Sequence, residues 1–152
     1  MALRQLRTIG DPILGKRSKE IKEIDDKLLA LIDDMEETML ATDGVGIAAV
    51  QVGVLKRVVL VRPEDETRVC INPVMLHQEG SQIGIEGCLS VPNRSGQVER
   101  PNRVKVSYMD VHGKEHIVEA EGFEARIFCH EIDHINGTLY VERLVEDEDS
   151  VL

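Results

Sequence analysis

The chain has 152 residues, of which 42% are hydrophobic and 30% are charged, an ordinary balance for a globular protein. Its length favours one domain over residues 1–152, and its formal net charge of −10 argues against binding to nucleic acid or to an anionic membrane, since both require a basic protein surface. The three cysteines, an odd number without a secretory leader, argue against a disulfide framework, so we expect a cytoplasmic protein.

The first predicted element is an amphipathic helix within residues 23–44. Its apolar residues recur at three- and four-residue spacing, with acidic residues in the gaps, and they are Leu28, Leu31, Ile32, Met35 and Met39. A carboxylate of Asp25 or Asp26 can cap the start of the helix by accepting a hydrogen bond from a backbone N–H. Asp43 and Gly44 mark its expected end, because glycine commonly follows the last turn of a helix.

The middle of the chain consists of β-prone runs punctuated by Pro, Gly or Asn. They cover residues 57–61, 68–79, 81–92, 96–100, 103–111 and 114–121, and the last two are joined by a hairpin turn. Residues 122–137 return to a helical pattern, and the acidic tail, residues 145–152, is expected to fray. This order predicts an α+β fold, in which mixed or antiparallel β-sheets pack around a C-terminal helix and an amphipathic helix lies near the N-terminus.

The predicted C-terminal helix carries the sequence His-Glu-x-x-His at residues 130–134. On a helix, His130 and His134 lie one turn apart on the same face, so both imidazoles can reach one metal ion. Glu131 is rotated by roughly 100° from His130, which suits a carboxylate that takes a proton from an acidified water and later delivers it to a leaving group. The alternative is a solvated helix face that carries these residues by chance. The helical context, with Gly137 just past the helix end, favours a metal site.

A catalytic metal site needs a third protein ligand and an open position. The downstream ligands usual for this motif are missing, because Tyr140 stands six residues after the second histidine and the chain ends at Leu152. The third ligand is therefore expected upstream, where the candidates besides carboxylates are His77, His112, His116, Cys70, Cys88 and, within the helix, Cys129. Of these, Cys129 points off the ligand face of the helix and is expected to pack as a small apolar residue.

Three segments occur in order along the chain: "GVGIAAVQVG" at residues 44–53, "EGCLSVP" at residues 86–92 and "HEIDH" at residues 130–134. In content, order and spacing they resemble the peptide deformylases, in particular their short, type 1-like bacterial form, and the likeness covers the whole chain. The opening residues 9–21 resemble the N-terminal strand and turn of that family. The resemblance implies a metal-dependent hydrolase that removes the formyl group from the N-terminal methionine of nascent polypeptides and releases formate.

The same resemblance implies the ligands of the metal. Cys88, His130 and His134 would bind one divalent ion, usually Fe²⁺, with Zn²⁺, Ni²⁺ or Co²⁺ as substitutes. A donor set of one thiolate and two imidazoles suits iron or zinc, and the spacing of the ligands does not choose between them. Glu131 would be the catalytic acid and base.

The resemblance also implies two oxyanion donors and a peptide site. The Gln51 side-chain amide and the Leu89 backbone N–H would stabilise the negative oxygen that forms during amide hydrolysis. The peptide would pair in extended form with the backbone around Gly46, and Val45 and Ile127 would line the pocket for the methionine side chain.

The residues around these groups are expected to support them. Glu86 would steady its loop or a metal ligand, Arg100 would form an ion pair with Asp43, and Asp133 would anchor the metal-binding helix. Formylmethionyl nascent peptides are the expected partner. Some bacterial relatives contact the ribosome through a longer, basic C-terminal helix, which this acidic ending does not match, so ribosome contact stays open.

Two other functions compete with deformylation. A general metallopeptidase would cleave internal peptide bonds and be indifferent to a formyl group, which a comparison of formate release with cleavage of unformylated peptides would reveal. A non-catalytic module would hold a structural metal, usually through four protein ligands. No fourth ligand stands out in the sequence, and such a module would leave Glu131 and Gln51 without a role.

Overall fold

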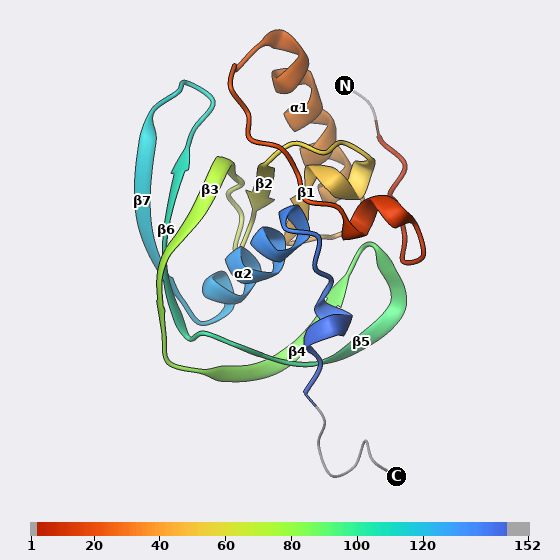
Figure 1. The fold of residues 1–152 in the computed structure, drawn as a ribbon, viewed down its shortest axis with the longest axis vertical. Helices are drawn as coiled ribbons and strands as arrows, with labels where there is room; N and C mark the ends of the chain where they lie inside the picture. Colours follow the sequence, from red (N-terminus) through yellow and green to blue (C-terminus); the bar gives the residue numbers. More distant parts are fainter. Residues whose placement is uncertain (1–2, 146–152) are drawn as a thin grey trace.

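In the described part of the chain, a five-stranded antiparallel sheet lies between two α-helices (Figure 1). The computed structural model describes residues 3–145. The strand order of the large sheet is β1 (Gly46–Ala48), β2 (Val58–Val61), β3 (Arg68–Glu79), β6 (Arg103–Met109) and β7 (Glu115–Glu121). A second, two-stranded sheet contains β4 (Gln82–Cys88) and β5 (Val91–Arg100). The helices are α1 (Asp26–Ala41) and α2 (Phe123–Ile135), with short 3₁₀ helices η1 (Pro12–Gly15), η2 (Ala49–Val52) and η3 (Tyr140–Arg143). The α+β prediction is confirmed.

The sequence of β2 explains why the helices lie on opposite faces of the large sheet. All four of its residues are apolar and fully buried. Val58 and Leu60 belong to the core cluster that contains the apolar face of α1, whereas Val59 and Val61 belong to the cluster that contains α2. Because successive side chains of a strand point to opposite faces, a continuous apolar run is stable only when both faces are covered.

Helix α1 begins and ends near the predicted positions. Asp25, rather than Asp26, is the N-cap, and its Oδ1 accepts a hydrogen bond from the Leu28 N–H at 2.8 Å. The helix ends at Ala41, and Asp43 follows with a positive φ of 54°.

Helix α2 ends where the sequence predicted. Gly137 follows it with a φ of 83°, and a Cβ at this position would lie 2.6 Å from the carbonyl oxygen of Gly15. Only glycine allows this left-handed turn and this close approach of two backbones. The C-terminal end of α2 is thereby packed against η1.

The β4–β5 hairpin differs from the predicted runs. Residues 81–92 were expected to form one strand, but the chain turns at Leu89 and Ser90, and β5 begins at Val91. Cys88 is paired with Val91, and the next pair joins Gly87 to Ser95, so residues 92–94 bulge out of the register. Pro92 lies in this bulge, where no backbone N–H is needed for a hydrogen bond between the strands. The proline therefore lies inside β5 instead of ending a strand.

The N-terminal strand expected within residues 9–21 is also wrong. This segment contains η1, whose start is capped by Asp11, the side chain of which accepts a hydrogen bond from the Ile13 N–H at 3.0 Å. Pro12 at the first position of η1 has a fixed φ and no N–H to donate, which favours this turn over a strand. Strand-like pairing is confined to a single bridge between Lys19 and Lys56.

Of the acidic tail, only its first residue can be described. The Val145 N–H donates a hydrogen bond to the carbonyl oxygen of Gln97 at 2.8 Å, which ties the end of the described chain to β5. Residues 146–152, on which the prediction of fraying rests, lie outside the described residues. Within residues 3–145, no helix is both long and apolar enough to cross a membrane.

Replacing Asp25 by alanine should lower the free energy of unfolding by about 1 kcal/mol, because the Leu28 N–H loses its capping acceptor. Urea denaturation followed by circular dichroism measures this difference. Asp33→Ala is the matched control, since it removes an exposed carboxylate from the middle of the same helix and introduces a better helix former. Equal losses in the two variants would contradict the capping role of Asp25.

Candidate active site

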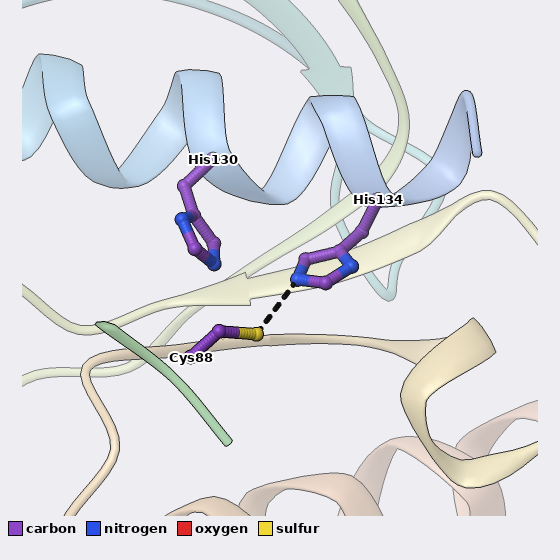
Figure 2. Close-up of side chains that lie close together, drawn as sticks. All are labelled: Cys88, His130 and His134. Atoms are coloured by element: carbon purple, nitrogen blue, oxygen red, sulfur yellow. Dashed lines mark hydrogen bonds between the residues drawn. The ribbon is translucent and has the colours of Figure 1, made fainter. Parts of the chain in front are cut away.

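Three side chains that can ligate a metal converge where the β4–β5 hairpin meets α2. Cys88 Sγ and one nitrogen each of His130 and His134 all lie within 4.8 Å of one another. Figure 2 shows both imidazoles descending from the same face of α2 toward the sulfur, and Cys88 Sγ lies 3.2 Å from His134 Nε2. Of the upstream candidates, the structure therefore brings Cys88 to the two histidines.

The remaining candidates lie elsewhere. His77 and His112 are exposed, and His116 is hydrogen-bonded to an aspartate of its own hairpin and stacked on a tyrosine. Cys70 and Cys129 are buried in the apolar core, and burial raises the pKa of each thiol, to about 12 and about 11. Such thiols stay protonated, which confirms Cys129 as a packing residue.

The donor atoms fit a small divalent ion. Neighbouring ligands of a tetrahedral ion with one thiolate and two imidazoles are about 3.6 Å apart, given bonds of about 2.1–2.3 Å, and the three donors span comparable distances. Burial, the largest influence, lowers the pKa of His134, which favours the neutral imidazole that a metal requires. Among residues 3–145, three protein donors meet at the site, the number typical of catalytic centres, whereas structural sites usually have four.

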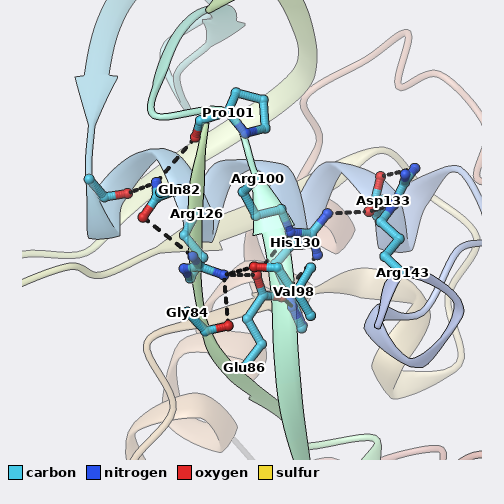
Figure 3. Close-up of polar contacts among 11 residues, drawn as sticks. Gln82, Gly84, Glu86, Val98, Arg100, Pro101, Arg126, His130, Asp133 and Arg143 are labelled. Atoms are coloured by element: carbon cyan, nitrogen blue, oxygen red, sulfur yellow. Dashed lines mark hydrogen bonds and ion pairs between the residues drawn. The ribbon is translucent and has the colours of Figure 1, made fainter. Parts of the chain in front are cut away.

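Glu86 fixes the orientation of His130. One carboxylate oxygen lies 2.8 Å from His130 Nδ1, which leaves Nε2 as the metal-facing nitrogen. The same carboxylate accepts two hydrogen bonds from Arg100 at 2.9 Å and one from Arg126 at 2.7 Å (Figure 3). Burial alone would raise the pKa of Glu86, but hydrogen bonds from Arg100 and His130 outweigh it and lower the pKa to about 2. Glu86 is therefore an anion at neutral pH, and it holds a candidate ligand rather than merely its own loop.

The expected ion pair between Arg100 and Asp43 is wrong. Arg100 is 4% exposed, and its guanidinium binds Glu86 and, at 2.7 Å, Asp133 on α2. Asp133 also pairs with Arg143 of η3, so this aspartate links α2 to β5 and to η3 (Figure 3). Asp43 is exposed at the end of α1, where it contributes to the wall of the pocket.

Glu131 lies beside the three donors with little contact to polar groups. It is 4% exposed, and its buried Oε1 has no hydrogen-bond partner among the described residues. Burial, the dominant influence, raises its pKa to about 7. A carboxyl group with this pKa can both accept and donate a proton at neutral pH.

Gln51 reaches the site from η2. It is 1% exposed, its Oε1 accepts a hydrogen bond from the Ala48 N–H at 2.9 Å, and its Nε2 lies 3.6 Å from Cys88 Sγ. An amide nitrogen is thereby directed at the space next to the candidate ligands. Leu89, the second expected donor, follows Cys88 directly and lines the same pocket.

The candidate ligands Cys88 and His130 form one end of a pocket of about 320 Å³ between the hairpin, β1 and α2. The pocket includes each predicted substrate contact: exposed Val45, and buried Gly46 and Ile127. A Cβ at Gly46 would lie 2.6 Å from Glu131 Oε2, so only glycine lets β1 pass this close to the carboxylate. The other lining residues are Asp43, Gly44, Gln51, Ile85, Glu86, Gly87, Leu89, Phe123, Arg126 and Glu131.

Sequence reasoning missed two residues of this site. Arg126 is buried and contacts Glu86, and its position one helical turn before His130 was a signal that both face the same strand. Tyr140 is buried in η3, and its ring stacks on His130 with centroids 6.1 Å apart. No local pattern indicates this stacking, because it depends on how the chain returns after α2.

A cysteine sulfur, two imidazoles and a buried carboxyl group beside one pocket are the groups that a metal-dependent hydrolase requires. The sequence matches the model of the polypeptide deformylase family over residues 3–150. It is 49% identical to peptide deformylase 1 of Clostridium acetobutylicum over 148 residues, covering 97% of this chain and 99% of that protein. It is 52% identical to the peptide deformylase of Lachnoclostridium phytofermentans over 147 residues, covering 95% and 90%.

Solved structures agree with these relatives. The fold is similar to the crystal structure of peptide deformylase from Thermotoga maritima, with a TM-score of 0.93 and 39% identity over 95% of this chain and 99% of that one. It is also similar to a Met-Ala-Ser-bound class I type b peptide deformylase from Acinetobacter baumannii, with a TM-score of 0.90 and 39% identity over 93% and 98%. The chain belongs to the polypeptide deformylase family. It is a metal-dependent enzyme that removes the N-formyl group from nascent peptides.

Replacing Glu86 by glutamine should weaken metal binding by roughly 10- to 100-fold, because His130 loses the carboxylate that orients it. The variant should also lose about 3 kcal/mol or more of stability, since two buried guanidinium groups lose their shared anion. Competition with a metal chelator measures the first effect, and urea denaturation measures the second. Glu99→Gln, an exposed change on β5, is the control, and equal metal affinity in both variants would contradict the orienting role of Glu86.

Proposed function

We propose that Cys88, His130 and His134 hold the divalent ion on which this family depends, with Fe²⁺ as the natural metal and Zn²⁺, Ni²⁺ or Co²⁺ as substitutes. The observation that carries this proposal is the convergence of the three donor atoms within 4.8 Å beside a buried carboxyl group. One thiolate and two imidazoles form a mixed donor set of a kind that iron and zinc accept. The ion would polarise the formyl carbonyl and lower the pKa of a water molecule.

Glu131 is the proton carrier in the proposed reaction. Its pKa, raised to about 7 by burial, lets the carboxylate take a proton from the attacking water and return it to the departing amine. The close approach of Gly46 places β1 against this carboxylate, and only 4% of Glu131 is exposed to solvent. The products are formate and a peptide with a free N-terminal methionine.

Gln51 and Leu89 are the proposed oxyanion donors. Attack on the formyl carbon places a negative charge on its oxygen, and donors fixed in advance around that oxygen lower the barrier. The Gln51 side-chain amide is buried and held from its oxygen end, so its nitrogen is already directed toward the ligands. The Leu89 backbone N–H belongs to the turn that follows Cys88.

The peptide lies between two strand edges in this proposal. β1 is the edge strand of the large sheet, and β4 pairs on one side with β5, so an extended peptide can add to either edge. Pairing around Gly46 would place the methionine side chain against Val45 and Ile127. The Met-Ala-Ser-bound relative from Acinetobacter baumannii supports a peptide that begins with methionine.

The proposed setting is the cytoplasm, where a catalytic domain spanning residues 1–152 meets formylmethionyl nascent chains. The net charge of −10 supports recognition of a peptide terminus rather than of nucleic acid. Contact with the ribosome stays outside the proposal. Membership of the polypeptide deformylase family argues against a general metallopeptidase, and the formyl dependence of the assay below checks this directly.

Glu131→Gln should retain the metal yet lose nearly all turnover, because an amide cannot carry the proton. Formate release from a formyl-Met peptide measures turnover, with the protein purified anaerobically and its metal content determined. An unformylated peptide of the same sequence should stay uncleaved by the wild type. Substantial formate release by the variant would contradict the role of Glu131 as proton carrier. Cleavage of the unformylated peptide by the wild type would favour a metallopeptidase.

Cys88→Ser should weaken ferrous binding or change the metal that the protein retains, since a hydroxyl is a poorer ligand than a thiolate. Metal content after dialysis and the absorption spectrum of the cobalt-substituted protein measure the change. Cys129→Ser is the matched control, because its sulfur lies in the core and off the ligand face. Full ferrous occupancy and a normal rate in Cys88→Ser would remove this residue from the ligand set.

A further inference from the structure

Ser90 is a buried residue that contacts two parts of the site at once. Its side chain is inaccessible to solvent, at 0% exposure, and it lies in the turn two residues after Cys88. Its Oγ accepts a hydrogen bond from Gln51 Nε2 at 3.1 Å, and its backbone N–H donates to Cys88 Sγ at 3.4 Å. The side chain of Ser90 thus contacts Gln51, whereas its backbone contacts Cys88.

The contact with Ser90 completes the restraint on the Gln51 amide. The amide oxygen accepts from the Ala48 N–H, which fixes one end of the group. Gln51 Nε2 carries two hydrogens, and one of them is donated to Ser90 Oγ. The other hydrogen is directed toward Cys88 Sγ and the space beside it. Without the serine acceptor, a buried donor would lack a partner, and the amide would turn about its last torsion to recover one.

The backbones of Gln51 and Ser90 are held independently of this contact. The Arg7 N–H donates to the carbonyl oxygen of Gln51 at 2.7 Å, and the Ile9 N–H donates to that of Ser90 at 2.8 Å. One N-terminal segment therefore ties η2 to the turn after Cys88. Removal of the serine oxygen should free the Gln51 side chain while its backbone and that of Cys88 stay in place.

We propose that Ser90 is a positioning residue, whose hydroxyl holds the Gln51 amide in the orientation that stabilises the oxyanion. The inference rests on the proposed role of Gln51 as an oxyanion donor. In this proposal, the Ser90 hydroxyl affects the rate of deformylation only by orienting Gln51. The contact of Ser90 with the candidate ligand Cys88 is made by its backbone N–H alone.

The first test compares Ser90→Ala with the wild type in the formate assay. The variant should lower kcat by about tenfold, less than the roughly 10²-fold expected for Gln51→Ala, because a misaligned donor still contributes. KM and metal affinity should stay within about threefold, since the backbone N–H to Cys88 is retained. Ser95→Ala, an exposed change on β5, is the control and should behave as the wild type.

The decisive measurement is the double variant Ser90→Ala/Gln51→Ala. If Ser90 acts through Gln51, its replacement has no further effect on kcat once Gln51 is gone. The same tenfold loss in both backgrounds would mean an independent structural effect and would overturn the inference, as would a normal kcat in Ser90→Ala. A normal rate in Gln51→Ala alone would instead overturn the role of Gln51, and the inference with it.

A measurement on the unaltered protein covers the case in which Ser90→Ala does not fold. In the zinc-loaded enzyme, the side-chain amide protons of Gln51 should exchange slowly with solvent and show nuclear Overhauser contacts to the β protons of Ser90. Fast exchange without such contacts would show that the amide is not held by the serine, and would overturn the inference.

Discussion

The site depends on one buried carboxylate. Glu86 lies on β4, and its partners are Arg100 on β5 and Arg126 and His130 on α2, so a single anion joins the small sheet to the helix that carries both histidines. Taking this carboxylate out of water is costly, and the two guanidinium groups and the imidazole offset that cost only in one arrangement. The contacts of Glu86 therefore determine where the small sheet lies against α2 more than they add to the stability of the fold. A shift of the hairpin along α2 would keep the Glu86–Arg100 pair, which lies within the hairpin, but it would separate buried Arg126 from its anion and move Cys88 away from the histidines.

Helix α2 can carry polar residues inside the protein because its other side chains meet a complementary surface. The face of β2 formed by Val59 and Val61 packs in the same core cluster as Ile127 and Phe128, while α1 covers the opposite face of the sheet. The histidines are thus held on a rigid element that packs through its apolar side chains, and Glu86 adds the rotation of the His130 ring and the contact between the hairpin and the helix. Where β1 passes the catalytic side of the helix, Gly46 supplies the space that a larger residue would take from Glu131.

The local patterns of the sequence predicted the helices, most strands and the two histidines of the candidate site, whereas Cys88 was chosen only by the resemblance to the peptide deformylases. Asp25 and Gly137 mark helix ends through their own chemistry, and His130 and His134 share a face by helical geometry alone. The incorrect predictions concern positions whose structure depends on residues far away in the sequence. Pro92 suggested the end of a strand but lies in a bulge, and the partners of Arg100 could not be known without the register of β4 against β5. The stacking of Tyr140 on His130 likewise depends on the path of the chain after α2.

Two buried carboxyl groups near the same donors differ because of their neighbours. Glu86 and Glu131 are both about 95% removed from solvent, at 5% and 4% exposure, so desolvation disfavours the charged form of each. Glu86 accepts hydrogen bonds from Arg100 and His130, which lower its pKa to about 2. Glu131 Oε1 has no hydrogen-bond partner among residues 3–145, and burial raises the pKa of this carboxyl group to about 7. Two carboxyl groups whose pKa values are driven apart in this way can have different roles in one site. The permanently charged one can fix a ligand, and the one that titrates near neutrality is suited to carry the proton.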